Sequence, residues 1–440
     1  MGMMSLFSVK SETPNKGRKP GIFAALDIGA SKTVCFIAKT EHTLAGLRAR
    51  VIGVGHQSTR GVKAGSIIDM DEASQSIRVA VENAERLAGQ TITEIYLSTT
   101  VGQPTSARIG VDMDIAASEV SDRDLRRVLS TALQESEGAG QALMHALPIS
   151  WRVDNHRGVR DPRGMFGNTL GVDMHVISAD CDPLQNLVAC VERCQLSVAG
   201  VVVTPLASGL SVLTPDEMTL GALVVDMGAH STSFGVFNEG SLQHVDAIPI
   251  GGAHVTNDIA RGLLTTVSAA ERIKALHGCA LDSPDDDQVM IEAPPVSDSN
   301  NASMNQHPRA LLNAIIRPRL EELFEIGRGR LKAAGVEKAA GPSVVLTGGA
   351  SQLPGTAELA TRVLGTQARL GAIQGLAGLG DAVSGPAFAA SAGVINRCVS
   401  GPVEAISGPP RIIQSGHRRV ITNEQERGPV AVLRWFAESF

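Results

Sequence analysis

Residues 21–38 have the sequence GIFAALDIGASKTVCFIA, in which one apolar run ends at Asp27 and a second begins at Val34. Each run has the length of a strand, and small or polar residues connect the two. We therefore expect a β-hairpin with a tight turn. The turn residues that offer a flexible backbone or a hydrogen-bond donor are Gly29, Ser31, Lys32 and Thr33.

The same pattern occurs again in the second half of the chain. Residues 221–237 have the sequence GALVVDMGAHSTSFGVF, with an apolar run that ends at Asp226. An Asp-x-Gly unit that recurs at such a long separation predicts two similar domains that face each other, not a solenoid of short repeats. The corresponding turn residues are Gly228, Ser231 and Thr232.

A third glycine motif, Gly348 and Gly349, follows the apolar run at residues 343–347. Glycines let backbone N–H groups approach phosphate oxygens closely, because no Cβ atom intervenes. Asp27 and Asp226 each end a strand, where a carboxylate can hold the water shell of Mg²⁺. Each turn alone is a weak signal, but three motifs in this order predict a phosphate-binding cleft between two domains.

The composition is that of an ordinary folded protein, and 440 residues suffice for roughly two to four domains. The formal net charge of −6 argues against a dedicated nucleic-acid-binding protein. The chain contains no apolar run long enough to span a bilayer and no signal peptide, so we expect it to stay in the cytoplasm. Its six scattered cysteines are expected to be reduced and mostly buried.

Between the two repeated units, short strands flank a helix over residues 101–177, which we interpret as an inserted small α/β subdomain. Residues 176–179 are expected to resume a strand of the core. In the second half, helical periodicity covers residues 255–264, 268–277 and 309–331. The acidic and Pro-rich residues 282–307 between them are expected to form a loop with short strands.

The last residues form a separate element in this interpretation. Residues 401–428 are polar and rich in Pro and Gly, which predicts a flexible linker. Pro429 then opens a short amphipathic helix, which is too short to span a membrane but long enough to lie in its surface. A helix docked on the chain's own core is the alternative. The residues expected to enter the lipid are Val432, Leu433, Trp435, Phe436 and Phe440.

Three further stretches make the interpretation specific: IGGAHVTNDIARGL at 250–263, AERIK at 270–274 and LNAIIRPRLEE at 312–322. Together with the three glycine motifs, they resemble the FtsA family of bacterial cell-division proteins, within the actin/Hsp70/sugar-kinase ATPase superfamily. The resemblance implies an α/β actin-like fold that binds ATP and Mg²⁺ in a cleft. It places Glu271 and Lys274 at the ribose and base, the alternative being a simple ion pair within one helix.

The family's domain scheme can be carried onto this chain. The resemblance implies a flexible N-terminus (1–20), subdomain 1A (21–100 and 178–212), the insertion 1C (101–177), subdomain 2A with a return to 1A (213–258 and 341–400), subdomain 2B (259–340), a linker (401–428) and a membrane-targeting helix (429–440).

The implied function is structural and recruiting. A family member polymerises, tethers the FtsZ ring to the cytoplasmic face of the inner membrane at the division site, and recruits later divisome proteins. Partner binding through subdomain 2B makes Arg317, Arg319 and Glu322 candidate contacts, beside Glu321 and Glu325, although a solvated face explains any one of them equally well. The alternatives are another actin-like scaffold, of the pilus-assembly type, and a small-molecule kinase of the same superfamily.

The second turn departs from the family's usual Asp-x-Gly-Gly-Gly-Thr-Thr-Asp. His230 places a ring where backbone would approach phosphate, and Ser233 replaces an acid. Because no residue stands out as a general base, we assign no catalytic residue. We expect nucleotide binding with weak ATPase activity at most.

Overall fold

The structure is a computed structural model. It describes residues 21–43, 46–63, 65–116, 118–135, 140–296, 304–400, 404–405 and 411–412.

The first domain is built on a six-stranded mixed sheet in the order β11-β6-β1-β2-β3-β19. The hairpin predicted from residues 21–38 is confirmed, because β1 and β2 pair antiparallel from Ile22↔Lys39 to Ile28↔Thr33. β6 pairs with β1 in parallel, and β11 pairs with β6 in parallel. The strands and covering helices are β1 (Ile22–Ile28), β2 (Lys32–Thr43), β3 (Gly46–Ser58), β6 (Glu94–Thr99), β11 (Ser197–Val203), β19 (Leu376–Ala377), α1 (Met70–Ala88) and α3 (Cys181–Glu192).

The second domain repeats this arrangement with a five-stranded sheet in the order β14-β13-β12-β17-β18. The β12–β13 hairpin matches β1–β2, and β17 pairs with β12 in parallel as β6 does with β1. The predicted duplication is therefore confirmed at the level of topology. The elements are β12 (Ala222–Met227), β13 (Thr232–Asn238), β14 (Ser241–Ile248), β17 (Ser343–Thr347), β18 (Ala368–Leu370), α5 (Pro215–Leu220) and α9 (Thr356–Leu364).

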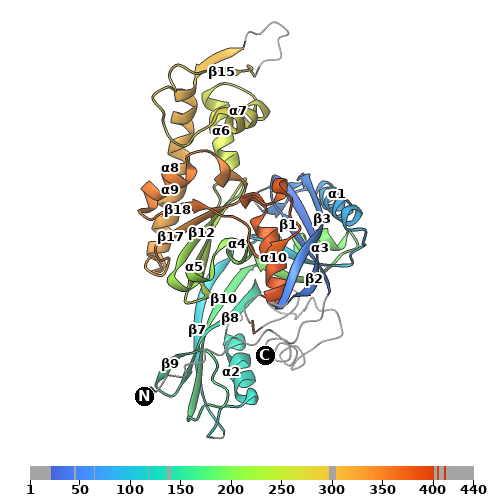
Figure 1. The fold of residues 1–440 in the computed structure, drawn as a ribbon, viewed down its shortest axis with the longest axis vertical. Coiled ribbons are helices and arrows are strands. Elements are labelled where there is room, and N and C mark those ends of the chain that lie inside the picture. The colour runs from blue at the N-terminus through green and yellow to red at the C-terminus, as the bar shows by residue number, and fades with distance from the viewer. Residues whose placement is uncertain are drawn as a thin grey trace, which may run out of the picture.

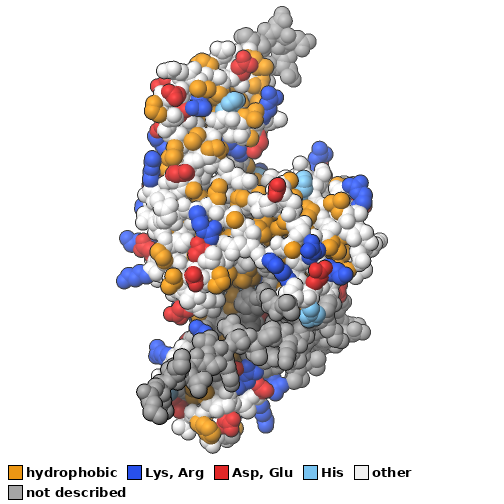
Figure 2. All heavy atoms as spheres, in the orientation of Figure 1, with side chains coloured by type: hydrophobic (Ala, Val, Ile, Leu, Met, Phe, Trp, Pro, Cys, Tyr) orange, Lys and Arg blue, Asp and Glu red, His pale blue; other side chains and the backbone are white. Residues whose placement is uncertain are grey.

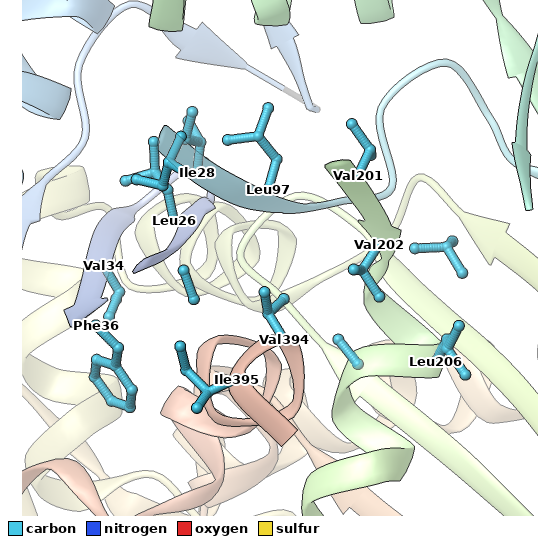
Figure 3. Close-up of a cluster of buried hydrophobic side chains, with 14 of the residues drawn as sticks. Leu26, Ile28, Val34, Phe36, Leu97, Val201, Val202, Leu206, Val394 and Ile395 are labelled. Carbon is cyan, nitrogen blue, oxygen red and sulfur yellow. The ribbon is translucent and has the colours of Figure 1, made fainter. Parts of the chain in front are cut away.

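Two helices, α4 (Thr204–Val212) and α10 (Ala389–Ser400), pass between the two sheets (Figure 1). They cross closely at Gly393, where an added Cβ atom would lie 1.6 Å from the Ala207 carbonyl oxygen, so no larger residue fits. Figure 3 shows Val394 and Ile395 of α10 directed toward Leu26 and Phe36 of the first sheet. These buried side chains hold the floor between the domains in place.

A separate sheet lies at one end of the molecule, below the first domain in Figure 1. It corresponds to the expected insertion, but one prediction was wrong. Residues 176–179 do not resume a core strand, because they form the end of β10, which pairs with β7 and β8. The elements are β7 (Thr105–Asp114), α2 (Asp122–Glu135), β8 (Gln141–Val153), β9 (His156–Val159) and β10 (Thr169–Asp180).

The opposite end is an arm formed by helices and one small hairpin (Figure 1). Within the region expected to be loop, two short strands pair antiparallel. Asp286 is buried beside them and accepts hydrogen bonds from Arg309 and Asn313, which fixes the loop to the long helix. The elements are α6 (Gly252–Gly262), α7 (Val267–His277), β15 (Met290–Ala293), β16 (Asn305–Pro308) and α8 (Arg309–Ala333).

The prediction of a flexible linker over residues 401–428 needs correction at two places. Glu404 is buried and bonded to His145 and Arg397, and the Ala405 amide donates to the Ala146 carbonyl at 2.9 Å. Further on, β20 (Arg411–Ile412) pairs with β8. Within this segment, β20 adds an edge strand to the inserted sheet and Glu404 is a buried carboxylate. Composition alone does not reveal either feature. The helix predicted over residues 429–440 and the N-terminal residues 1–20 lie outside the described residues.

In the described part of the chain, no helix is both long and apolar enough to cross a membrane. None of the six cysteines forms a disulfide in the described part of the chain, and four of them are buried.

Candidate functional site

A cavity of about 660 Å³ lies between the two domains, within the range of ligand pockets, which is roughly 300–1,000 Å³. The surface is visibly hollowed between the arm of α6–α8 and the lobe that carries α1 (Figure 2). Of the thirteen residues predicted to bind the nucleotide, eleven line the cavity. They are Asp27, Gly29, Ser31, Lys32, Asp226, Gly228, Ser231, Glu271, Lys274, Gly348 and Gly349.

The other two, Thr33 and Thr232, do not line it. Both are fully buried, and each pairs with the residue that ends the preceding strand of its hairpin. Thr33 Oγ1 lies 2.8 Å from Thr59 Oγ1, and Thr232 Oγ1 donates to the Ile250 carbonyl at 2.8 Å. They are the first inward-facing residues of their return strands, so their hydroxyls brace the turns from behind and do not face the cavity.

The sequence interpretation missed residues that follow the other parallel strands. Thr99 at the end of β6, Thr100 and Val101 just after it, and Thr204 after β11 also line the cavity. Because the carboxyl ends of parallel strands meet at one edge of a sheet, the apolar stretches that form β6 and β11 carried the signal that would have found them.

The two turns have the same backbone geometry. The Gly29 amide donates to the Lys32 carbonyl at 3.0 Å, and the Gly228 amide donates to the Ser231 carbonyl at 2.9 Å. The second turn is further held by α6, whose amides at Gly252 and Ala253 donate to the carbonyls of Gly228 and Ala229. Two matched turns therefore face the cavity from opposite domains.

The two aspartates lie at the floor of the cavity. Burial, together with the negative charge of Asp226, raises the pKa of Asp27 to about 7, although Lys32 opposes this shift. Burial also raises the pKa of Asp226, whose Oδ2 accepts hydrogen bonds from Ser208 Oγ at 2.5 Å and Thr347 Oγ1 at 2.9 Å. Two acids this desolvated favour a nearby cation.

Lys32 crosses the floor toward α10. Its Nζ donates to the Ala387 carbonyl at 3.0 Å and lies 3.5 Å from the centre of the Phe388 ring. Burial lowers the pKa of Lys32, while both aspartates act in the opposite direction. The ammonium group thus contacts a carbonyl and an aromatic face, while the two carboxylates act on it through their charge.

Glu271 and Lys274 form the ion pair that was the alternative for them, and they also border the cavity. The two charged groups lie 2.7 Å apart within α7. Thr256 joins them, because its Oγ1 lies 2.5 Å from Glu271 Oε2 and 2.8 Å from Lys274 Nζ. Desolvation alone would raise the pKa of Glu271, but the bonds from Lys274 and Thr256 lower it.

Gly348 and Gly349 form one wall. Gly348 has a φ of 82°, and a Cβ atom there would lie 2.4 Å from the Met227 carbonyl oxygen. A Cβ atom at Gly349 would meet nothing within 4 Å, since this residue borders open space. The wall is therefore flat backbone, against which a planar group can lie.

The partner residues predicted on α8 are engaged within the chain. Arg319 bonds to Asp258 of α6 at 2.6 Å and to Glu322 at 2.5 Å. Arg317 bonds to Asp282 and lies 3.6 Å from Glu321. These side chains form an ion-pair network that joins α8 to its neighbours, and they lie away from the cavity.

Two sheets of matching topology around a cleft, with a hairpin turn from each at its floor, define the actin-like ATPase fold class. A model of the family "Cell division protein FtsA" matches residues 223–393, and a model described as "SHS2 domain inserted in FTSA" matches residues 102–178. The chain is 42% identical to cell division protein FtsA of Agrobacterium fabrum, covering 89% of this chain and 90% of that protein. The chain belongs to the FtsA family of cell-division proteins.

More distant relatives agree with this assignment. Identity is 34% to FtsA of Pseudomonas aeruginosa and 32% to FtsA of Escherichia coli K12, each over 85% of this chain, and the match covers 88% and 90% of those proteins, respectively. Among solved structures, the PilM-PilN type IV pilus biogenesis complex contains a similar fold, with a TM-score of 0.60 and 18% identity over 86% of this chain and 98% of that one. The structural likeness concerns the fold, whereas the sequence relatives give the chain a role in cell division.

Proposed function

We propose that this chain binds ATP with Mg²⁺ in the cleft, assembles with further copies of itself, and links FtsZ to the cytoplasmic face of the inner membrane at the division site. The observation that carries the proposal is the pair of matched turns, at Gly29 and Gly228, that face one cavity from two duplicated domains. Later divisome proteins would then be recruited to the assembled polymer.

The residues present fit a nucleotide and its metal. Backbone turns with small residues suit phosphate oxygens, and the flat wall at Gly349 suits a planar nucleoside. Asp27 and Asp226 would hold the water shell of Mg²⁺, which would neutralise charge on the phosphates. Glu271 and Lys274, at the α7 side of the cavity, would contact the ribose and base.

We propose weak hydrolysis at most. In the second turn, His230 and Ser233 both line the cavity, and Ser233 pairs directly with Asp226. A serine at this place cannot accept a proton from an attacking water as a carboxylate would. The nucleotide would then act mainly as a regulator of assembly.

Membrane attachment is assigned to residues 429–440, on the pattern of the sequence. Burying each large apolar side chain of this helix in lipid is worth roughly 1.5–3 kcal/mol before the helix is ordered. One tail would therefore bind reversibly, while a polymer with many tails would bind firmly through effective concentration. For partner binding, the ion-pair network of Arg317, Arg319 and Glu322 would shape the α8 surface of the arm.

Co-sedimentation with FtsZ and anionic liposomes, with and without Mg·ATP, tests the proposal. The full chain should bring FtsZ to the lipid fraction, and a chain that ends at Arg427 should bind FtsZ without reaching lipid. If the truncated chain is still found in the lipid fraction, the membrane assignment is wrong. If neither chain retains FtsZ, the tethering function is wrong.

A further inference from the structure

The two turns can be compared residue by residue, because they are equally long. In the hairpins, Ile28 pairs with Thr33 and Met227 pairs with Thr232. The same internal hydrogen bond closes both turns, from Gly29 to Lys32 and from Gly228 to Ser231. His230 therefore occupies the position of Ser31, and Ser231 occupies the position of Lys32.

This register shows how each turn supplies positive charge. The first turn carries Lys32, whose ammonium group is held at the Ala387 carbonyl and the Phe388 ring. Residues 226–232 contain no lysine or arginine, and their one group that can become a cation is the His230 imidazole. Since His230 lines the cavity, it is placed where the second turn would meet a bound anion.

The first backbone donors of α6 are already in use. The first amides of α6, at Gly252 and Ala253, donate to the carbonyls of Gly228 and Ala229, and the Gly251 amide donates to His254 Nδ1 at 3.1 Å. The start of the helix therefore holds the turn in place. The ring of His230 lies on this scaffold, edge-on to His254, with ring centres 6.3 Å apart.

The His230 ring is incompletely satisfied. Its Nδ1 is buried, and it has no hydrogen-bond partner among the residues that the structure describes. Burial, the neighbouring His254 of α6 and Lys63 of β4 (Val62–Lys63) all lower the pKa of His230. Without an anion in the cavity the imidazole is therefore neutral near pH 7. A bound anion would favour the protonated form of the ring.

We propose that His230 is the phosphate ligand of the second turn, and that it takes up a proton from solvent when Mg·ATP binds. The inference rests on the proposed nucleotide binding and adds a position, a charge state and a pH dependence to it. A histidine here makes nucleotide affinity rise as the pH falls toward 6, which a serine or glycine at this position cannot do.

Calorimetry with Mg·ATP at pH 7 tests this role. Titrations in PIPES and in Tris, which differ in ionisation enthalpy, give the number of protons taken up on binding. The wild-type chain should take up a measurable fraction of a proton, whereas His230→Gln should lose that uptake and bind about tenfold more weakly, because a charge-assisted hydrogen bond is gone. His230→Lys should keep the affinity to within about threefold without proton uptake, because its charge is permanent.

The controls separate this role from other effects. His277→Gln, at the exposed end of α7, should behave as wild type. A proton released from Asp27 on metal binding is common to all four chains, so the difference between wild type and His230→Gln reports on His230 alone.

Two results would overturn the inference: equal proton uptake in the wild type and in a folded His230→Gln chain, or equal affinity for Mg·ATP in both. A wild-type chain that gives no heat of binding with Mg·ATP would instead remove the proposed nucleotide binding, and this role with it. Thermal unfolding of each variant shows whether the chain is folded.

Discussion

Ser106 of β7 and Val245 of β14 meet at two hydrogen-bond distances: the Val245 amide donates to Ser106 Oγ at 2.7 Å, and the same Oγ lies 3.1 Å from the Val245 carbonyl oxygen. His175 of β10 completes the contact, with Nδ1 2.8 Å from the Leu242 carbonyl and Nε2 2.9 Å from Ser106 Oγ. The inserted sheet is thereby fixed to the edge strand of the second domain. Because a carbonyl only accepts, Nδ1 of His175 carries the proton and the Ser106 hydroxyl can donate to Nε2.

Removing this contact should loosen the inserted sheet. Ser106→Ala leaves the His175 ring and the Val245 amide without their shared partner, which should lower the free energy of unfolding by about 1–3 kcal/mol. Hydrogen exchange at the Val245 amide should accelerate. The matched control is Ser150→Ala in the same sheet, whose hydroxyl bonds to Asp173 within that sheet. Unchanged exchange at Val245 in Ser106→Ala would show that the contact does not hold the two parts together.

A side chain added to the cavity wall at Gly349 should weaken nucleotide binding without destabilising the fold. Gly349→Val adds a side chain where the folded chain has open space, so the thermal unfolding midpoint should stay the same. A nucleoside lying on this wall would be displaced at a cost of ~1–3 kcal/mol, which weakens Mg·ATP binding about five- to a hundredfold. Gly380→Val, also next to open space but outside the cavity lining, should bind as wild type. Equal affinity in both variants would contradict the placement of the nucleoside.

A pH dependence follows from Glu217, which caps α5 and bonds to Arg369 of β18. Desolvation alone would raise the pKa of Glu217, but the bonds from Arg369 and the Thr214 amide lower it from its ordinary value of 4.5 to about 2. A lowered pKa in the folded state means that the stability from this carboxylate is complete above pH 4.5 and is lost as the pH falls toward 2.

Glu217→Gln should therefore unfold at a lower temperature than wild type at pH 7, with a loss of about 1–3 kcal/mol. The difference between the two chains should shrink when thermal unfolding is measured at decreasing pH below 4.5. Glu82→Gln, an exposed change on α1, provides the control and should follow the wild type. A gap that is constant from pH 7 down to pH 3 would contradict the assigned linkage.

Glu404 attaches the C-terminal segment to the folded domains through His145 and Arg397. The Val203 amide donates to His145 Nε2 at 2.9 Å, so His145 Nδ1 carries a proton and donates to Glu404 at 2.5 Å. Arg397 lies 2.7 Å from the same carboxylate oxygen. Glu404→Ala removes the negative charge between these groups and should cost about 3–5 kcal/mol.

Hydrogen exchange checks this attachment locally, because the Ala405 amide donates to the Ala146 carbonyl. That amide should exchange faster in Glu404→Ala, while Glu325→Ala on the exposed side of α8 should leave it unchanged. Slow exchange at Ala405 in a folded Glu404→Ala chain would mean that the strand pairing alone holds the segment.

Local pattern was enough to predict most of the fold. Apolar runs of strand length that end in Asp and Gly encode the two hairpins, since turn residues and strand periodicity act over a few residues. The long separation between the Asp27 and Asp226 units then predicts the duplication, and with it the cleft. Nine predicted residues of the three glycine motifs line the cavity for this reason, and Glu271 and Lys274, expected from the family resemblance, line it as well.

The sequence by itself determined that two like hairpins exist and which small residues form their turns. Only the tertiary structure decided which side chains face the cleft: Thr33 and Thr232 are buried behind their turns, while Thr99 reaches it from the end of β6 and Thr204 from the start of α4. It also decided that residues 176–179 belong to the inserted sheet and that Glu404 has buried partners. The physical reason is that facing and partnership depend on register between strands far apart in the chain, and a shift of one residue turns every side chain to the other face.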